Sequence, residues 1–219
     1  GEKRGETDSE RAWSGVRMKN QELQSKSVFY PNRSESDRAS WPLRSVTTSG
    51  EAMVCSICPR RCGAVRDETH GEGFCRMPSL PVCARAALHF WEEPCLSGKT
   101  GAGTVFFSGC TLGCVFCQNR PISRENYGKG LTEDGLYAVF QRLADQGAAC
   151  IELVTPTHFT HVLAKVLERP APNGLPVVWN SGGYERADVL KTLEGKADVY
   201  LPDLKYVTPS IAAKYSGAA

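Results

Sequence analysis

Three cysteines fall within eight consecutive positions, in the stretch "FFSGCTLGCVFCQN" at residues 106–119: Cys110, Cys114 and Cys117. A four-iron, four-sulfur cluster is normally held by four cysteine thiolates, and the spacing C-x3-C-x2-C supplies three. One iron is then left open, and an open position on a metal centre allows a substrate to bind there. The alternative is a closed zinc or ferredoxin-type site that takes its fourth cysteine from elsewhere, for which Cys95 and Cys150 are candidates.

A second cysteine group lies upstream, in "CSICPRRCGAVRDETHGEGFC" at residues 55–75. Four thiolates within such a short stretch suit either a closed tetrahedral zinc site or a second iron-sulfur cluster, and the spacing does not separate the two. His70 is an alternative ligand. The four cysteines of this group are Cys55, Cys58, Cys62 and Cys75. We expect the remaining cysteines to be small, buried apolar residues: Cys83, Cys95 and Cys150.

The composition excludes several classes of protein. With 219 residues, 41% hydrophobic and 23% charged, the chain can form one globular domain with appendages. Its formal net charge of +2 gives no electrostatic reason to bind nucleic acid or a membrane surface. No apolar run reaches the length of a spanning helix or forms a signal peptide, so we expect a cytoplasmic protein. The ten cysteines are grouped as metal ligands would be, which favours metal over disulfides.

The chain divides into three segments by composition. Residues 1–52 are rich in Ser, Arg and Glu, and we expect them to be disordered or poorly structured. Residues 53–100 form a Cys-rich, metal-binding region in which no long periodic element is evident. Residues 101–219 have a regular pattern of short apolar runs and helical stretches.

Four apolar runs in the last segment end at Gly, Pro, Asn or Asp, as strands buried on both faces do. Helical spacing of apolar residues fills the gaps, and Thr132 is the expected N-cap of the first helix. Alternating strands and helices predict parallel βαβ units in an α/β fold, with the chemistry at the carboxyl ends of the strands. The four runs are "GTVFFSG" (103–109), "CIELVTP" (150–156), "PVVWNSGG" (176–183) and "VYLPDLK" (199–205).

The stretch "CTLGCVFCQN" resembles the C-x3-C-x-aromatic-C signature of the radical S-adenosylmethionine (SAM) superfamily. More narrowly, the chain from about Cys55 onward resembles an uncharacterised family related to the activating enzyme of pyruvate formate-lyase. The stretches that carry this resemblance are "HFWEEPCLSGKTGAGTVFFSGCTLGCVFCQN", "VTPTHF", "WNSGGYE" and "YLPDLKY". It implies a partial (β/α) barrel of parallel strands. Such a barrel needs more units than the four counted here, so we expect it to be C-terminally truncated in this chain.

The resemblance also implies roles for individual residues. Cys110, Cys114 and Cys117 would bind three irons of a 4Fe-4S cluster, while the amino and carboxylate groups of SAM chelate the fourth. Phe116 would lie beside the adenine, Asn180 and Ser181 near the ribose and methionine, and Asp203 and Lys205 close to the cofactor carboxylate. Asn180 and Ser181 also suit a simple turn, Asp203 a helix N-cap and Lys205 a surface charge.

One stretch departs from the family pattern. After the second strand, the activating enzymes usually carry a Gly-Gly-Glu type of sequence that meets the cofactor amino group. This chain has "TPTH" at residues 155–158 instead, where Thr155 and Thr157 are the candidate oxygen ligands.

Two hypotheses of function follow. In the first, implied by the resemblance, the protein is an enzyme that reductively cleaves SAM to a 5'-deoxyadenosyl radical and abstracts hydrogen from a substrate. The implied partners are a flavodoxin or ferredoxin as electron donor and a glycyl-radical enzyme as substrate. In the second, two cysteine sites stabilise a non-catalytic binding or electron-transfer module.

Overall fold

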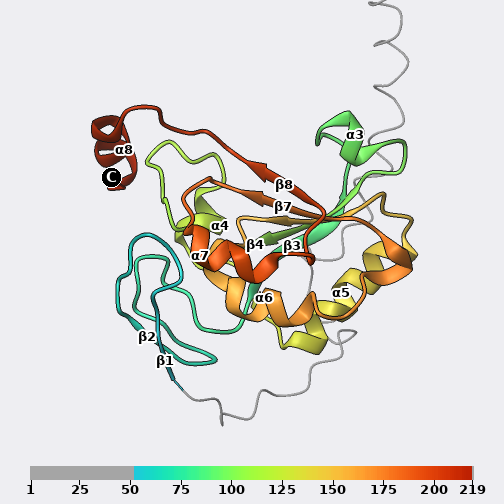
Figure 1. Ribbon diagram of the computed structural model, residues 1–219, viewed down its shortest axis with the longest axis horizontal. Helices are drawn as coiled ribbons and strands as arrows, with labels where there is room; N and C mark the ends of the chain where they lie inside the picture. The colour runs from blue at the N-terminus through green and yellow to red at the C-terminus, as the bar shows by residue number, and fades with distance from the viewer. Residues whose placement is uncertain (1–51, 219) are drawn as a thin grey trace, which may run out of the picture.

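The computed structural model describes residues 52–218, so the expectation for the N-terminal segment falls almost entirely on residues outside the described part. The described residues form a mixed α/β structure around a six-stranded sheet with strand order β5-β3-β4-β6-β7-β8 (Figure 1). Its strands are β3 (Val82–His89), β4 (Ala102–Phe107), β5 (Lys129–Gly130), β6 (Ile151–Val154), β7 (Val177–Ser181) and β8 (Val199–Pro202). The helices are α3 (Pro94–Ser97), α4 (Arg120–Arg124), α5 (Glu133–Asp145), α6 (Thr160–Val166), α7 (Ala187–Leu190) and α8 (Pro209–Ser216).

The four strands expected from the apolar runs are confirmed as β4, β6, β7 and β8, and they pair in parallel. β4, β6 and β7 are largely buried, as expected. The expectation of burial on both faces is wrong for β8, in which partly buried and exposed residues alternate. The reason is its position at the edge of the sheet, where it has β7 as its single neighbour. A partial barrel remains a prediction.

Strand β3 differs from the expectation that residues 53–100 contain no long periodic element. Its sequence "VCARAALH" is rich in alanine, which carries little strand signal. The strand pairs antiparallel with β4 on one side and with β5 on the other. Part of the Cys-rich region therefore belongs to the central sheet.

Helices α5, α6 and α7 all lie on one face of the sheet in Figure 1. The apolar face of α5 packs there because Leu136, Val139, Phe140 and Leu143 repeat at helical spacing and are buried. The hydroxyl of Thr132 accepts a hydrogen bond from the backbone N–H of Gly135 at 3.1 Å, which confirms this residue as the N-cap. Residues from β4, β6 and β7 complete the hydrophobic core under these helices: Val105, Phe107, Ile151, Leu153, Val177 and Trp179.

Two smaller parts flank the sheet. A short antiparallel hairpin, β1 (Met53–Val54) with β2 (Val65–Arg66), forms a separate two-stranded sheet, and three of the four upstream cysteines lie between its strands. Helix α8 lies beyond the end of β8, on the side where α4 follows β4 (Figure 1). Within residues 52–218, no helix is long and apolar enough to span a lipid bilayer.

Candidate functional site

The loop that contains Cys110, Cys114 and Cys117 joins the carboxyl end of β4 to α4, as the sequence predicted. Gly109, the residue before the first cysteine, has a φ of +77°. A Cβ atom there would lie 2.4 Å from a side-chain carbon of Met77 and 2.9 Å from the carbonyl oxygen of Cys75. A glycine is therefore required where the loop begins, because the chain both turns and passes close to the Cys-rich segment.

Each of the three loop cysteines has a hydrogen-bond donor at its sulfur. The hydroxyl of Ser216 donates to Cys114 Sγ at 3.0 Å, and that of Ser123 donates to Cys117 Sγ at 3.4 Å. Burial raises the pKa of the Cys110 thiol, and hydrogen bonds from the backbone N–H groups of Gly113 and Leu112 partly offset this rise. Donors to sulfur stabilise thiolates and tune iron-sulfur clusters, so this donor set fits such a cluster.

Arg60, from the upstream segment, holds this loop in place. Its guanidinium donates to the carbonyl oxygens of Thr111 at 2.5 Å and Leu112 at 3.0 Å, both between the first two loop cysteines. It also donates to the carbonyls of Ser216 at 2.6 Å and Gly217 at 3.0 Å, at the end of α8. The same guanidinium lies 3.3 Å from the ring centroid of Phe74. Arg60 was not among the predicted site residues, although its place between Cys58 and Cys62 was a signal.

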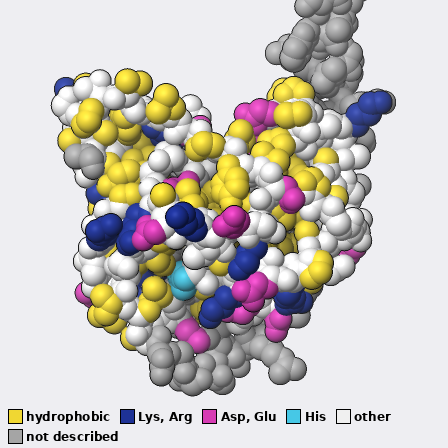
Figure 2. Space-filling view, viewed as in Figure 1, with side chains coloured by type: hydrophobic (Ala, Val, Ile, Leu, Met, Phe, Trp, Pro, Cys, Tyr) yellow, Lys and Arg dark blue, Asp and Glu magenta, His cyan; other side chains and the backbone are white. Residues whose placement is uncertain are grey.

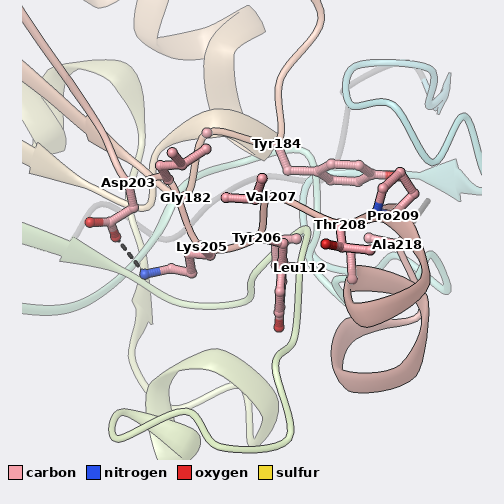
Figure 3. A pocket seen from close by; sticks show the side chains of 13 residues that line it. Leu112, Gly182, Tyr184, Asp203, Lys205, Tyr206, Val207, Thr208, Pro209 and Ala218 are labelled. Atoms are coloured by element: carbon pink, nitrogen blue, oxygen red, sulfur yellow. Dashed lines mark hydrogen bonds and ion pairs between the residues drawn. The ribbon is translucent and has the colours of Figure 1, made fainter.

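A pocket of about 200 Å³ opens beside the cysteine loop, at the carboxyl ends of β7 and β8 (Figure 3). Leu112 from the loop forms part of its lining. Asp203 and Lys205 lie at one end of the pocket and form an ion pair at 2.5 Å, while Tyr184 and Pro209 lie at the other end. Both of these predicted cofactor-binding residues therefore line a cavity next to the candidate cluster loop.

Asn180 and Ser181, the other two predicted cofactor-binding residues, are consecutive in β7, but their side chains have different surroundings. Successive strand residues point to opposite faces of a sheet. Asn180 donates at 2.8 Å to the carboxylate of Glu152, whereas Ser181 donates at 2.6 Å to Glu185. Neither residue lines the pocket that contains Asp203.

Glu152 and Glu185 are polar centres that the sequence analysis missed. Glu152 is fully buried in β6, where it also accepts a hydrogen bond from Thr104 Oγ1 at 3.0 Å. Glu185 accepts hydrogen bonds from Thr157 Oγ1 at 2.9 Å and Trp179 Nε1 at 2.8 Å as well as from Ser181. The single charge inside the apolar run "IELV" was a signal for Glu152. The hydroxyl of Thr157, a candidate oxygen ligand, therefore already donates a hydrogen bond to Glu185.

Two further predicted residues lie in the segments that follow β4 and β6. Phe116 is 58% exposed, and its ring contacts those of Tyr206 and Tyr215 edge-on at centroid distances of 6.2 and 6.3 Å. Thr155 follows β6 with a φ of +57°, a strained conformation for a β-branched residue.

Of the three cysteines expected to be small buried residues, two are buried and one is not. Cys83 and Cys150 are buried, and burial raises the pKa of their thiols to about 12 and about 11. Cys95 was expected to be buried but is exposed, because it lies on the one-turn helix α3 at the surface. All ten cysteines are free thiols, including the four of the upstream group.

Across residues 52–218, no three His, Cys, Asp or Glu side chains are grouped as ligands of a metal ion. This applies to the loop cysteines and to the upstream cysteines alike. A cluster does not require that grouping, because each thiolate binds a different iron.

Comparison with known proteins gives two similarities. Residues 96–210 match the family described as a 4Fe-4S single cluster domain. An uncharacterised protein of Methanocaldococcus jannaschii is 31% identical over an alignment of 161 residues that covers 69% of this chain. The chain spans 45% of the length of that relative.

Proposed function

We infer that this chain, which belongs to the family of 4Fe-4S single cluster domains, holds its cluster with Cys110, Cys114 and Cys117 and is a SAM-dependent radical enzyme. The single observation that supports this most is the loop itself. It offers three thiols, each with a hydrogen-bond donor at its sulfur, at the end of a parallel strand. A four-iron cluster on three thiolates keeps one iron for another ligand.

The pocket beside the loop supports SAM as that ligand. Asp203 and Lys205 place a negative and a positive charge side by side, which complements the ammonium and carboxylate groups of an amino acid. The pocket volume of about 200 Å³ is smaller than the roughly 300–1,000 Å³ of common small-molecule sites. We therefore assign to it the methionine end of SAM, and we assign to the exposed ring of Phe116 the stacking on adenine.

The chemistry divides between the bound groups and the protein. A cluster held by Cys110, Cys114 and Cys117 would supply the electron for the reductive cleavage of SAM, and SAM would supply the group that abstracts hydrogen from the substrate. The residues of the chain bind and orient: Asp203 and Lys205 fix the amino-acid end, while Ser123 and Ser216 donate to the cluster thiolates. We keep Asn180 and Ser181 as ribose and methionine contacts, which requires each to exchange its present carboxylate partner.

The surface around the site supports protein partners. Large apolar side chains are exposed on the cysteine loop, between β8 and α8, and on α8 itself: Val115, Phe116, Leu204, Val207 and Ile211. Figure 2 shows hydrophobic side chains gathered on this part of the surface. Contiguous exposed apolar surface marks interaction sites. We propose a flavodoxin or ferredoxin as electron donor and a glycyl-radical enzyme as hydrogen donor.

Anaerobic reconstitution with iron and sulfide, followed by SAM and dithionite, tests the proposal. We expect 5'-deoxyadenosine and methionine from the wild-type protein and from Cys95→Ala, a control at an exposed cysteine outside both groups. Cys114→Ala leaves two thiolates in the loop and should abolish both products. An iron-loaded wild-type protein that forms neither product would instead be the electron-transfer module, and product formation by Cys114→Ala would refute the ligand assignment.

A further inference from the structure

The four upstream cysteines lie outside the residues that match the single-cluster family, so that match does not explain them. The β1–β2 hairpin gathers three of them around one turn. The backbone N–H of Cys55 donates to Ala64 at 2.9 Å, and the N–H of Gly63 donates back to the Cys55 carbonyl at 3.1 Å. Within the turn, the N–H of Arg61 donates to the Cys58 carbonyl at 3.0 Å. Cys55, Cys58 and Cys62 are thereby fixed near one another.

The fourth cysteine, Cys75, lies close to the other three. A Cβ atom on Gly73 would lie 3.1 Å from Cys62 Sγ, so the chain just before Cys75 passes directly over the third cysteine. Cys55 and Cys58 are 5% and 8% exposed. Burial raises the pKa values of Cys58 and Cys75, and neighbouring thiols of the same group, Cys55 among them, add to both rises. The four cysteines thus form one group, which we call the upstream quartet.

A buried cation beside the quartet points to negative charge there. Arg66 is 1% exposed, and its Nη1 lies 3.5 Å from Cys55 Sγ. Its other acceptors are the backbone carbonyls of Pro78 and His158. None of the ion pairs found within residues 52–218 involves Arg66. An unpaired buried charge is costly, whereas metal-bound thiolates at the quartet would neutralise it.

The arrangement favours a cluster over a single zinc ion. Zinc would require four sulfurs at about 2.3 Å from one ion. No three ligands within the described residues are grouped around such a point. The loop cysteines of the 4Fe-4S domain share this property, because a cluster distributes its thiolates over separate irons.

We propose that Cys55, Cys58, Cys62 and Cys75 hold a second iron-sulfur cluster, which Arg60 joins to the loop of the first. Arg60 lies between two quartet cysteines, and its guanidinium hydrogen-bonds to the loop carbonyls of Thr111 and Leu112. The second centre therefore lies against the first site. This inference goes beyond SAM cleavage and does not depend on it.

Iron, zinc and sulfide counts on the anaerobically reconstituted full chain test the proposal. We expect about eight irons in the wild-type protein and in the control Cys95→Ala, since a 4Fe-4S cluster contributes four. A variant in which all three loop cysteines are replaced by alanine should keep about four irons and four sulfides, and so should Cys55→Ala/Cys58→Ala.

About four irons in the wild-type protein would overturn the second cluster, whether or not any variant folds. One zinc and no iron in the loop variant would also overturn it and would assign the quartet to zinc. Circular dichroism shows which variants are folded. The iron and sulfide counts require no SAM. A protein that fails to cleave SAM can therefore still show the second cluster, and the two proposals are tested separately.

Discussion

At the scale of single residues, the guanidinium of Arg60 connects the upstream segment to the candidate site. Its donors engage four carbonyl groups, two in the cysteine loop and two at the end of α8. A planar guanidinium with five N–H donors on three nitrogens can do this, whereas a lysine ammonium has three donors on one nitrogen and cannot reach all four carbonyls. The shape of the arginine side chain, as well as its positive charge, therefore makes these four hydrogen bonds possible.

We predict that Arg60→Lys destabilises the protein by about 1–3 kcal/mol, because it loses two or more hydrogen bonds to carbonyls. Urea unfolding of the reconstituted protein measures this. The electron paramagnetic resonance signal of the reduced loop cluster should change as well, since the loop loses its support. Arg61→Lys is the matched control, because Arg61 is exposed. Equal effects of the two substitutions would contradict the special role of Arg60.

At the scale of elements, the sheet has a polar patch on the face opposite α5 and α6. Glu152 in β6 is joined to Thr104 in β4 and Asn180 in β7. Glu92, just before α3, lies close enough to hydrogen-bond with Glu152. Burial, together with Glu152, raises the pKa of Glu92 to about 7. Glu93, Asp203 and His89 also face Glu92. The fold therefore favours the protonated form of this carboxyl.

A pH dependence of stability follows. Because the pKa of Glu92 in the fold is above its ordinary value, its contribution is present at low pH and is lost as pH rises through about 7. Glu92→Gln mimics the protonated form, so its melting temperature should exceed that of the wild type more at pH 8 than at pH 5. Exposed Glu72, which is not among the groups that face Glu92, provides the control variant Glu72→Gln. A difference that is the same at both pH values would show that Glu92 does not titrate in this way.

The elements also show what could be predicted from the sequence. Strands β4, β6, β7 and β8 and helix α5 were predictable, because apolar periodicity and the Thr132 cap are local signals. Strand β3 was not, since alanine-rich sequence takes its conformation from its neighbours in the sheet. The partners of Glu152 and Arg60 were equally out of reach, because each lies 28 or more residues away in the chain.

At the scale of the whole molecule, the described residues fall into two unequal parts. The sheet and its helices share one large hydrophobic core, whereas the β1–β2 hairpin has strands of two residues each. Arginines dock the hairpin segment: Arg60 on the loop, Arg66 on the His158 carbonyl, and Arg186, which donates to the Ser56 carbonyl. A segment this small commonly needs a bound metal to fold, so we expect the hairpin to depend on the proposed second cluster.

Removal of the metals should therefore affect the two parts differently. We predict that a chelator exposes new trypsin cleavage after Arg61 or Arg66, while residues 82–202 remain as a protected fragment. Mass spectrometry of the fragments after brief digestion, with and without chelator, gives the comparison. Simultaneous loss of the fragment would mean that the sheet, too, requires the metals.

The contacts of α8 have a consequence for the order of events during biosynthesis. Ser216 lies 102 residues after Cys114, yet its hydroxyl donates a hydrogen bond to the Cys114 sulfur. Its carbonyl accepts a hydrogen bond from Arg60, which lies 156 residues upstream. Translation delivers the cysteines first, and at roughly 5–20 residues per second the ribosome needs several seconds to reach Ser216. During that interval the nascent loop lacks its last donor. If the loop binds the cluster as proposed, a cluster delivered to the nascent chain would meet the complete set of hydrogen-bond donors only after α8 has emerged from the ribosome.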